Sequence, residues 1–300
     1  MTIPVILDTD IGSDVDDTWA LAMLLRCPEL DLQLVLTDTL DTTYRARITA
    51  RLLDIAGRTD VAIGIGLKGE ARLNEFQAPW VVDYDLSDYP GPIHQDGVQS
   101  MIDLIRAADE TVTIIGISPA PNLLHALTVA PDIAPKCRFV GMFGSIDRGY
   151  GDGSAPIAET NVREHVTAAR AIFAAPWQEI IITPLDTCDQ AILYGERYQR
   201  VRQSDDALMQ AVIENYRIWA DLVTWMTVDF FDERSSTLFD TVAVYLAYSQ
   251  ELLNIESMRL RVTDDGRTIR DEAGDLIHVA LSWCDLDGFY DHLVARLLNT

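Results

Sequence analysis

The chain has little positive charge, and almost none of it comes from lysine. Its 300 residues include 23 lysines and arginines against 47 aspartates and glutamates, so the formal net charge is −24. The two lysines are Lys68 and Lys136. This negative charge argues against nucleic acid or an anionic membrane surface as a partner. It is compatible with a neutral or cationic ligand, or with a bound metal ion.

Cysteine is also scarce, and no pair of cysteines has the C-x-x-C spacing of a zinc or redox motif. Four widely separated cysteines suit a reducing compartment: Cys27, Cys137, Cys188 and Cys284. The N-terminal segment lacks the basic region and cleavage site of a secretory signal. No apolar run is long enough to cross a bilayer. We therefore expect a cytoplasmic protein without membrane contact.

Apolar runs of strand length alternate with segments of helical periodicity. After the strand that begins at Val5, further strands are expected at residues 32–37, 61–64, 112–117, 138–142 and 179–183. Helices are expected from about Asp16 and at residues 43–56, 96–108, 162–175, 206–226, 238–248 and 285–298. Residues 66–95 have little periodicity, as in a functional lid or a disordered segment.

This alternation predicts an α/β fold with an open, mostly parallel, Rossmann-like sheet and helices on both faces. Residues 258–262 and 276–281 differ, because they resemble antiparallel strands with a turn at 264–266. We expect them to form a small C-terminal addition. No linker or repeat interrupts residues 1–300, so the sequence predicts a single domain.

Five carboxylates lie where the first strand gives way to the first helix: Asp8, Asp10, Asp14, Asp16 and Asp17. Like charges about 4 Å apart repel by several kcal/mol at an effective dielectric near 20. A helix N-terminus offsets only about 0.3–1 kcal/mol of this per charge. The segment is therefore either a solvated acidic loop or a site for a hard cation, and oxygen-only ligands favour calcium or magnesium.

Polar side chains also follow the other predicted strands. The residues at these positions are Asp10, Asp38, Asp41, Asn122, Asp147 and Asp186. The carboxyl ends of parallel strands share one edge of the sheet, so these side chains could converge on one cleft. The alternative is that each caps a strand or starts a helix.

Five segments in order resemble motifs of the inosine-uridine preferring nucleoside hydrolase family. The first, Asp8–Asp17, resembles the family's D-x-D-P-G-x-D-D pattern with two extra residues before the paired aspartates. The others are Ile117–Leu123, Met142–Gly144, Pro156–Asn161 and Phe239–Ala243. One such motif is weak support, whereas five in the family's order are strong support.

The resemblance implies the nucleoside hydrolase fold and a calcium-dependent enzyme that cleaves ribonucleosides to free base and ribose. The metal ligands would be Asp10, Asp17, Asp240 and the backbone carbonyl of Pro121, with Asp10 as general base on a metal-bound water. The ribose would contact Asp16, Asp41, Met142, Glu159 and Asn161. The resemblance also implies purine or pyrimidine salvage by a homodimer or homotetramer. Carboxylates suit this chemistry, because positive charge develops on the ribose during N-glycosidic cleavage.

Two departures from the family concern substrate choice. Phe239 stands where many members have the histidine assigned as acid on the leaving base, and Gly153 stands where many have an asparagine for the ribose 5′-hydroxyl. Candidate contacts to the base are His94, Trp80, Trp219, Trp225 and Phe239. The base preference stays open.

Three other functions compete with this one. Asp8-Thr9-Asp10 at a strand end also suits a haloacid-dehalogenase-type phosphatase, but Lys136 is the only late lysine available for that chemistry. Phe239 and Gly153 would also suit a catalytically impaired nucleoside- or ribose-binding protein. A third possibility is a hydrolase of another N-riboside.

Overall fold

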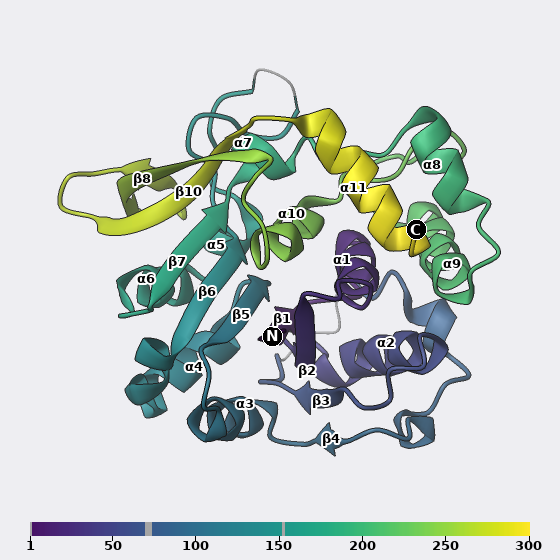
Figure 1. Ribbon diagram of the computed structural model, residues 1–300, viewed down its shortest axis with the longest axis horizontal. Helices are drawn as coiled ribbons and strands as arrows, with labels where there is room; N and C mark the ends of the chain where they lie inside the picture. Colours follow the sequence, from purple (N-terminus) through teal and green to yellow (C-terminus); the bar gives the residue numbers. More distant parts are fainter. Residues whose placement is uncertain (1, 70–73, 152–153) are drawn as a thin grey trace.

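A ten-stranded sheet forms the centre of the computed structural model, which describes residues 2–69, 74–151 and 154–300 (Figure 1). The strand order is β4-β3-β2-β1-β5-β6-β7-β10-β8-β9. Their bounds are β1 (Ile3–Thr9), β2 (Leu30–Thr37), β3 (Ala62–Ile65), β4 (Ile93–His94), β5 (Val112–Ile117), β6 (Cys137–Met142), β7 (Glu179–Thr183), β8 (Leu253–Val262), β9 (Thr268–Arg270) and β10 (Asp275–Trp283). The strands from β4 to β10 in this order pair in parallel, and β8 and β9 extend the sheet as antiparallel strands.

Helices connect most of these strands. Their bounds are α1 (Asp16–Leu24), α2 (Thr42–Ile55), α3 (Gly97–Ala107), α4 (Pro121–Val129), α5 (Thr160–Glu164), α6 (Val166–Ala174), α7 (Leu185–Cys188), α8 (Gly195–Arg202), α9 (Ala207–Leu222), α10 (Phe239–Leu246) and α11 (Leu286–Leu298). Several begin at a carboxylate cap. For example, Asp206 accepts hydrogen bonds from the backbone N–H groups of Leu208 and Met209 at the start of α9.

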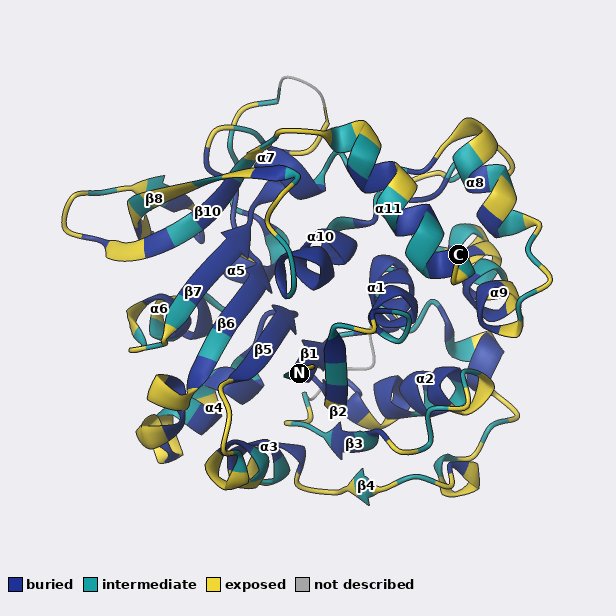
Figure 2. Cartoon of the chain, viewed as in Figure 1, coloured by how far each residue is buried: buried dark blue, intermediate teal, exposed yellow. Residues whose placement is uncertain are grey.

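Two apolar clusters cover the two faces of the sheet. Alternate residues of β1 face opposite clusters, because Val5 and Leu7 belong to one and Ile6 to the other. One cluster includes residues of α1, α2, α9, α10 and α11, and the second includes residues of α3, α4 and α6. Figures 1 and 2 show these two helix layers on opposite sides of a largely buried sheet. The predicted fold class is confirmed.

The chain order reverses at β1. From β1 the sheet runs through β2 to β4 in one direction, and through β5 to β7 in the other. The crevice outside the carboxyl ends of strands at such a reversal is where open α/β sheets bind ligands. The acidic segment that follows β1 begins at this point, which places the predicted cation site at the expected position in the fold.

Several predicted elements differ from the observed ones. The expected helix 162–175 is two helices, α5 and α6, divided at His165. The turn at 264–266 joins β8 to β9 and not to β10. Helices α4 and α8 were not predicted, and residues 66–95 include two short 3₁₀ turns and β4.

Among the described residues, no helix has both the length and the apolar composition that a membrane crossing requires. Gly153, which stands where many family members have an asparagine, lies outside the described residues.

Candidate active site

A cavity of about 630 Å³ opens at the carboxyl end of the central strands. Ten of the residues expected to contact the metal, the ribose or the base line it, and they come from segments far apart in the chain. They are Asp10, Asp16, Asp17, Met142, Glu159, Asn161, Trp219, Trp225, Phe239 and Asp240. The fold therefore brings most of the predicted site residues together around one space.

Three buried carboxylates form a compact cluster on one wall of the cavity. Asp16 and Asp17 are the first two residues of α1, and Asp240 is the second residue of α10. One oxygen from each carboxylate lies within 4.8 Å of the others. Both helix N-termini favour negative charge, but this contribution is small. Three converging oxygen donors of this kind are suited to a hard cation.

Burial and mutual repulsion strongly affect the protonation of this cluster. Burial is the main cause that raises the pKa of Asp16, Asp17 and Asp240 well above the ordinary aspartate value. Neighbouring aspartate charges raise these pKa values further. A cation among the three groups would remove this repulsion and favour the ionised forms.

Asp10 follows β1 directly and lies beside the cluster. Its carboxylate keeps 20% side-chain exposure and pairs with the guanidinium of Arg45, at 3.7 Å from Oδ2 to Nη2. Burial raises the pKa of Asp10, whereas the charge of Arg45 lowers it. Asp10 is thus the most accessible of the three predicted carboxylate ligands, since Asp17 and Asp240 are buried.

Behind the cavity wall, further buried polar groups are linked by hydrogen bonds and form what we call the floor of the cavity. Thr9 donates a hydrogen bond to Asp17. Ser118 donates to the fully buried carboxylates of Asp8 and Asp38. Asp38 and Asn122 were expected at the cleft, but neither lines the described cavity, and Asn122 donates to Asp8 at 3.2 Å. These residues are part of the floor and do not reach the cavity.

Glu159 and Asn161 form another wall of the cavity at the start of α5. The carboxylate of Glu159 accepts hydrogen bonds from the backbone N–H groups of Gly144, Asn161 and Val162. Burial raises the pKa of Glu159 to about 7, although these three bonds oppose the shift. Asn161 donates to the backbone carbonyl of Met142 at 3.0 Å. Backbone contacts therefore fix both side chains rigidly.

Aromatic rings also line the cavity. Trp219 and Trp225 meet edge to face at a centroid distance of 6.2 Å, and Phe76 packs against Trp225 at 5.1 Å. Phe239 contacts Tyr150 at 5.8 Å. Trp219 is buried and donates to the carbonyl of Ser13, whereas Trp225 is 50% exposed. The cavity lining thus combines a group of carboxylates, called the carboxylate end below, with these aromatic rings, called the aromatic end.

Four predicted site residues do not line the described cavity: Pro121, Asp41, His94 and Trp80. Pro121 begins α4, and Asp41 caps α2 next to the cavity residue Leu40. His94 is exposed on β4. The indole of Trp80 is buried and donates to Glu214. Pro121 and Asp41 lie just after the strands β5 and β2, near the site. His94 lies on the edge strand β4, and Trp80 lies in a 3₁₀ turn, so neither is part of the cavity lining.

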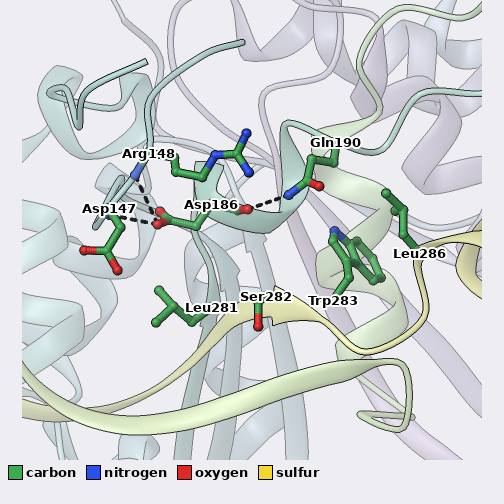
Figure 3. A pocket seen from close by; sticks show the side chains of 8 residues that line it. All are labelled: Asp147, Arg148, Asp186, Gln190, Leu281, Ser282, Trp283 and Leu286. Atoms are coloured by element: carbon green, nitrogen blue, oxygen red, sulfur yellow. Dashed lines mark hydrogen bonds between the residues drawn. The ribbon is translucent and has the colours of Figure 1, made fainter. Parts of the chain in front are cut away.

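Asp147 and Asp186 also lie outside the cavity. They line a separate groove of about 460 Å³ (Figure 3). Asp186 accepts hydrogen bonds from the backbone N–H groups of Ile146, Asp147 and Arg148, so its carboxylate holds this loop. Asp147 pairs with Arg270. The expectation that the polar residues after the strands share one cleft is therefore wrong for these two, because both carboxylates have structural partners.

Asp14, one of the five carboxylates after the first strand, also lies on the cavity wall, and burial raises the pKa of this carboxyl to about 6. The sequence alone assigned no role to Tyr150 or Arg45. Tyr150 belongs to the glycine-rich loop after β6, where no pattern distinguished it. Arg45 belongs to α2 and pairs with Asp10. Its position on the buried face of that helix is the feature of the sequence that could have indicated a role in the site.

Comparison with known proteins gives consistent results. Residues 5–291 match the family described as inosine-uridine preferring nucleoside hydrolase. The chain is 30% identical over 228 residues to the non-specific ribonucleoside hydrolase RihC of Escherichia coli O1:K1, which covers 72% of this chain and 73% of that protein. It is also 30% identical over 205 residues to RihC of Escherichia fergusonii, where the match covers 64% of each chain, less than two thirds of that relative.

Solved structures share the fold at lower sequence identity. A plant nucleoside hydrolase superposes with a TM-score of 0.84 at 20% identity, with 100% of both chains covered. A purine-preferring ribonucleoside hydrolase from Gardnerella vaginalis gives 0.76 at 22% identity, covering 99% of this chain and 98% of that one.

Proposed function

The chain belongs to the inosine-uridine preferring nucleoside hydrolase family and is a nucleoside hydrolase, and we propose that it cleaves ribonucleosides with the help of calcium and of Asp10 as general base. The observation that carries this proposal is the cluster of Asp16, Asp17 and Asp240 beside Asp10, on one wall of the cavity. Clustered buried carboxylates are costly unless a cation or a proton neutralises them.

The donor set fits calcium. All of the donors are oxygens, and none comes from cysteine or histidine. Calcium prefers oxygen ligands, whereas zinc prefers the softer sulfur and imidazole ligands. Asp10, Asp17, Asp240 and the carbonyl of Pro121 would hold the ion. When bound, it would supply positive charge that favours ionisation of a nearby water and orients the ribose hydroxyls. The partly exposed Oδ atoms of Asp10 would accept the proton from the attacking water.

The carboxylate end of the cavity suits the ribose. Asp16, Glu159 and Asn161 would accept or donate hydrogen bonds to its hydroxyls, with Met142 against the ring and Asp41 next to them. Fixed negative charge at this end stabilises the positive charge that develops on the sugar as the bond to the base breaks. Because Glu159 and Asn161 are tied to backbone groups, they need little reorganisation during the reaction.

The aromatic end suits the base. Trp219, Trp225 and Phe239 line the cavity, and a planar heterocycle would pack against their rings. Phe239 cannot donate a proton, so the leaving base would have to depart with solvent or another donor as its acid. His94 and Trp80 do not line the described cavity, and we propose no contact between them and the base.

Phe239 is also the observation that favours a second candidate, a hydrolase of another N-riboside whose leaving group needs no acid. A catalytically impaired nucleoside-binding protein would share the same cavity. Cytoplasmic salvage by a homodimer or homotetramer remains part of the proposal, and light scattering of the purified protein measures its assembly state.

The test is the release of free ribose from a panel of purine and pyrimidine ribonucleosides, with calcium and with a chelator. We expect release with calcium and a loss of about 10²–10⁴-fold in Asp10→Asn, as for removal of a general base. Asp83→Asn, an exposed carboxylate far from the cavity, is the matched control and should behave as wild type. Tight nucleoside binding without any ribose release would instead support a binding protein.

A further inference from the structure

Arg45 is a buried cation next to the acidic wall of the cavity. It belongs to α2 and is 1% exposed, and among the described residues it is the one lysine or arginine with full burial. Burying a guanidinium is unfavourable unless hydrogen bonds and a counter-charge compensate for the lost water. Its contacts therefore show what the protein uses it for.

The guanidinium bridges two loops that border the cavity. Towards the loop after β1, Nη1 donates to the carbonyl of Ile11 at 2.9 Å and Nη2 donates to the hydroxyl of Ser13 at 3.0 Å. Towards the loop after β2, Nε donates to the carbonyl of Thr39 at 3.0 Å and Nη2 to its hydroxyl at 3.2 Å. The same Nη2 lies 3.7 Å from the carboxylate of Asp10.

The second of these loops has an unfavourable backbone. Thr39 and Leu40 are both left-handed, with φ of 57° and 51°. Residues with a β-carbon rarely adopt this conformation, and Thr is β-branched. Leu40 lines the cavity, and Asp41 follows it. Such a turn persists only where its surroundings hold it, and Arg45 contacts both the carbonyl and the hydroxyl of Thr39.

We propose that Arg45 is a positioning residue that fastens the loop carrying Asp10 to the loop carrying Leu40 and Asp41, so that the Asp10 carboxylate keeps its place beside the three clustered aspartates. This inference rests on the proposed function, because it acts through Asp10. The planar fork of arginine is required, since its donors must reach Ile11, Ser13 and Thr39 at once. A lysine would keep the charge but has a single ammonium group.

The experiment compares Arg45→Lys and Arg45→Gln with wild type. Arg106→Gln is the matched control, because Arg106 also pairs through two hydrogen bonds with a carboxylate, Asp132, on the surface away from the cavity. Ribose release gives kcat and KM, and hydrogen–deuterium exchange follows peptides that cover residues 9–16 and 37–43.

We expect both Arg45 variants to lose about 10²-fold in kcat, the cost of misplacing a catalytic group by about 1 Å. KM should change by less than about threefold if the loops mainly position the reacting groups. Exchange should rise in both peptides and stay unchanged in Arg106→Gln. Full activity in Arg45→Lys would overturn the inference, because charge alone would then suffice.

The two readouts separate this inference from the proposed function. If wild type releases no ribose, the proposed function fails, and exchange still tests the link between the two loops. If wild type is active and neither peptide exchanges faster in the Arg45 variants, the link is refuted. An Arg45→Gln protein that does not fold leaves Arg45→Lys to decide.

Discussion

Calcium binding should release protons from the aspartate cluster and stabilise the protein. Two charges 4.8 Å apart repel by about 3.5 kcal/mol at an effective dielectric near 20. Three such pairs repel by about 10 kcal/mol, which is comparable to the whole stability of an ordinary protein. At least one of the carboxyls of Asp16, Asp17 and Asp240 must therefore hold a proton when no cation is bound.

The sign of the pH dependence follows from the raised pKa values of these carboxyls. In the folded protein without calcium they bind protons that the unfolded chain would release above about pH 4. The contribution of this cluster to stability without calcium should therefore be greatest at low pH and fall as the pH rises through the folded pKa values. Calcium removes this loss, so its stabilising effect should grow from pH 5 to pH 7.5.

Calorimetric titration with calcium in buffers of different ionisation enthalpy measures the protons released. We expect at least about one proton per ion near pH 6. At a free calcium concentration of about 100 times Kd, stabilisation is about 2.7 kcal/mol, and for a chain of 300 residues the melting temperature rises by about 4 °C. Asp240→Asn should bind calcium more weakly and release fewer protons. Equal apparent binding heats in all buffers, with no change in melting temperature, would refute the reasoning.

Three further predictions concern the aromatic end and the floor of the cavity. Trp225→Ala should raise KM by about tenfold, as expected for loss of one stacked ring, with little change in melting temperature because the side chain is half exposed; an unchanged KM would remove Trp225 from the base contacts. Phe239→His should raise kcat by at least about tenfold for nucleosides whose base needs a proton to leave, and the gain should disappear above the pKa of the new histidine. Ser118→Ala should cost about 1–3 kcal/mol in urea unfolding, because it removes a donor between two buried carboxyls. The exposed Ser87→Ala is its control, and equal stability of both variants would contradict a role for Ser118 in the floor.

The central part of the fold could be predicted because its signals are local. The runs at 112–117 and 179–183 are apolar and bounded by turns, and β5 and β7 have those bounds. Helix α4 was missed because the prolines at 119 and 121 indicated only the end of a strand. The left-handed backbone of Ala120, which allows the helix to begin at Pro121, has no signature in the sequence. The 264–266 turn was assigned to the wrong pair of strands, because β9 has only three residues. Short elements of this kind depend on pairing that no local pattern specifies.

The site could be predicted where topology determines it. Asp10 follows the first strand, and Asp17 and Asp240 lie in the first turn of a helix; a parallel sheet places the ends of its strands and the starts of the helices that follow them at one edge. Trp80 and Trp219 were both candidate base contacts, and both have apolar neighbours in the sequence, yet Trp80 packs against Arg51 and Glu214 while Trp219 lines the cavity. Whether a side chain faces the core or the cavity depends on tertiary packing.

The most direct test of the account measures ribose release as a function of free calcium, together with the calcium dissociation constant of the same protein. The account predicts that activity and binding have the same midpoint, and that Asp240→Asn shifts both to higher calcium by the same factor. Ribose release that persists at calcium concentrations where the ion has dissociated would contradict the assignment of the buried aspartates as the site of the catalytic cation.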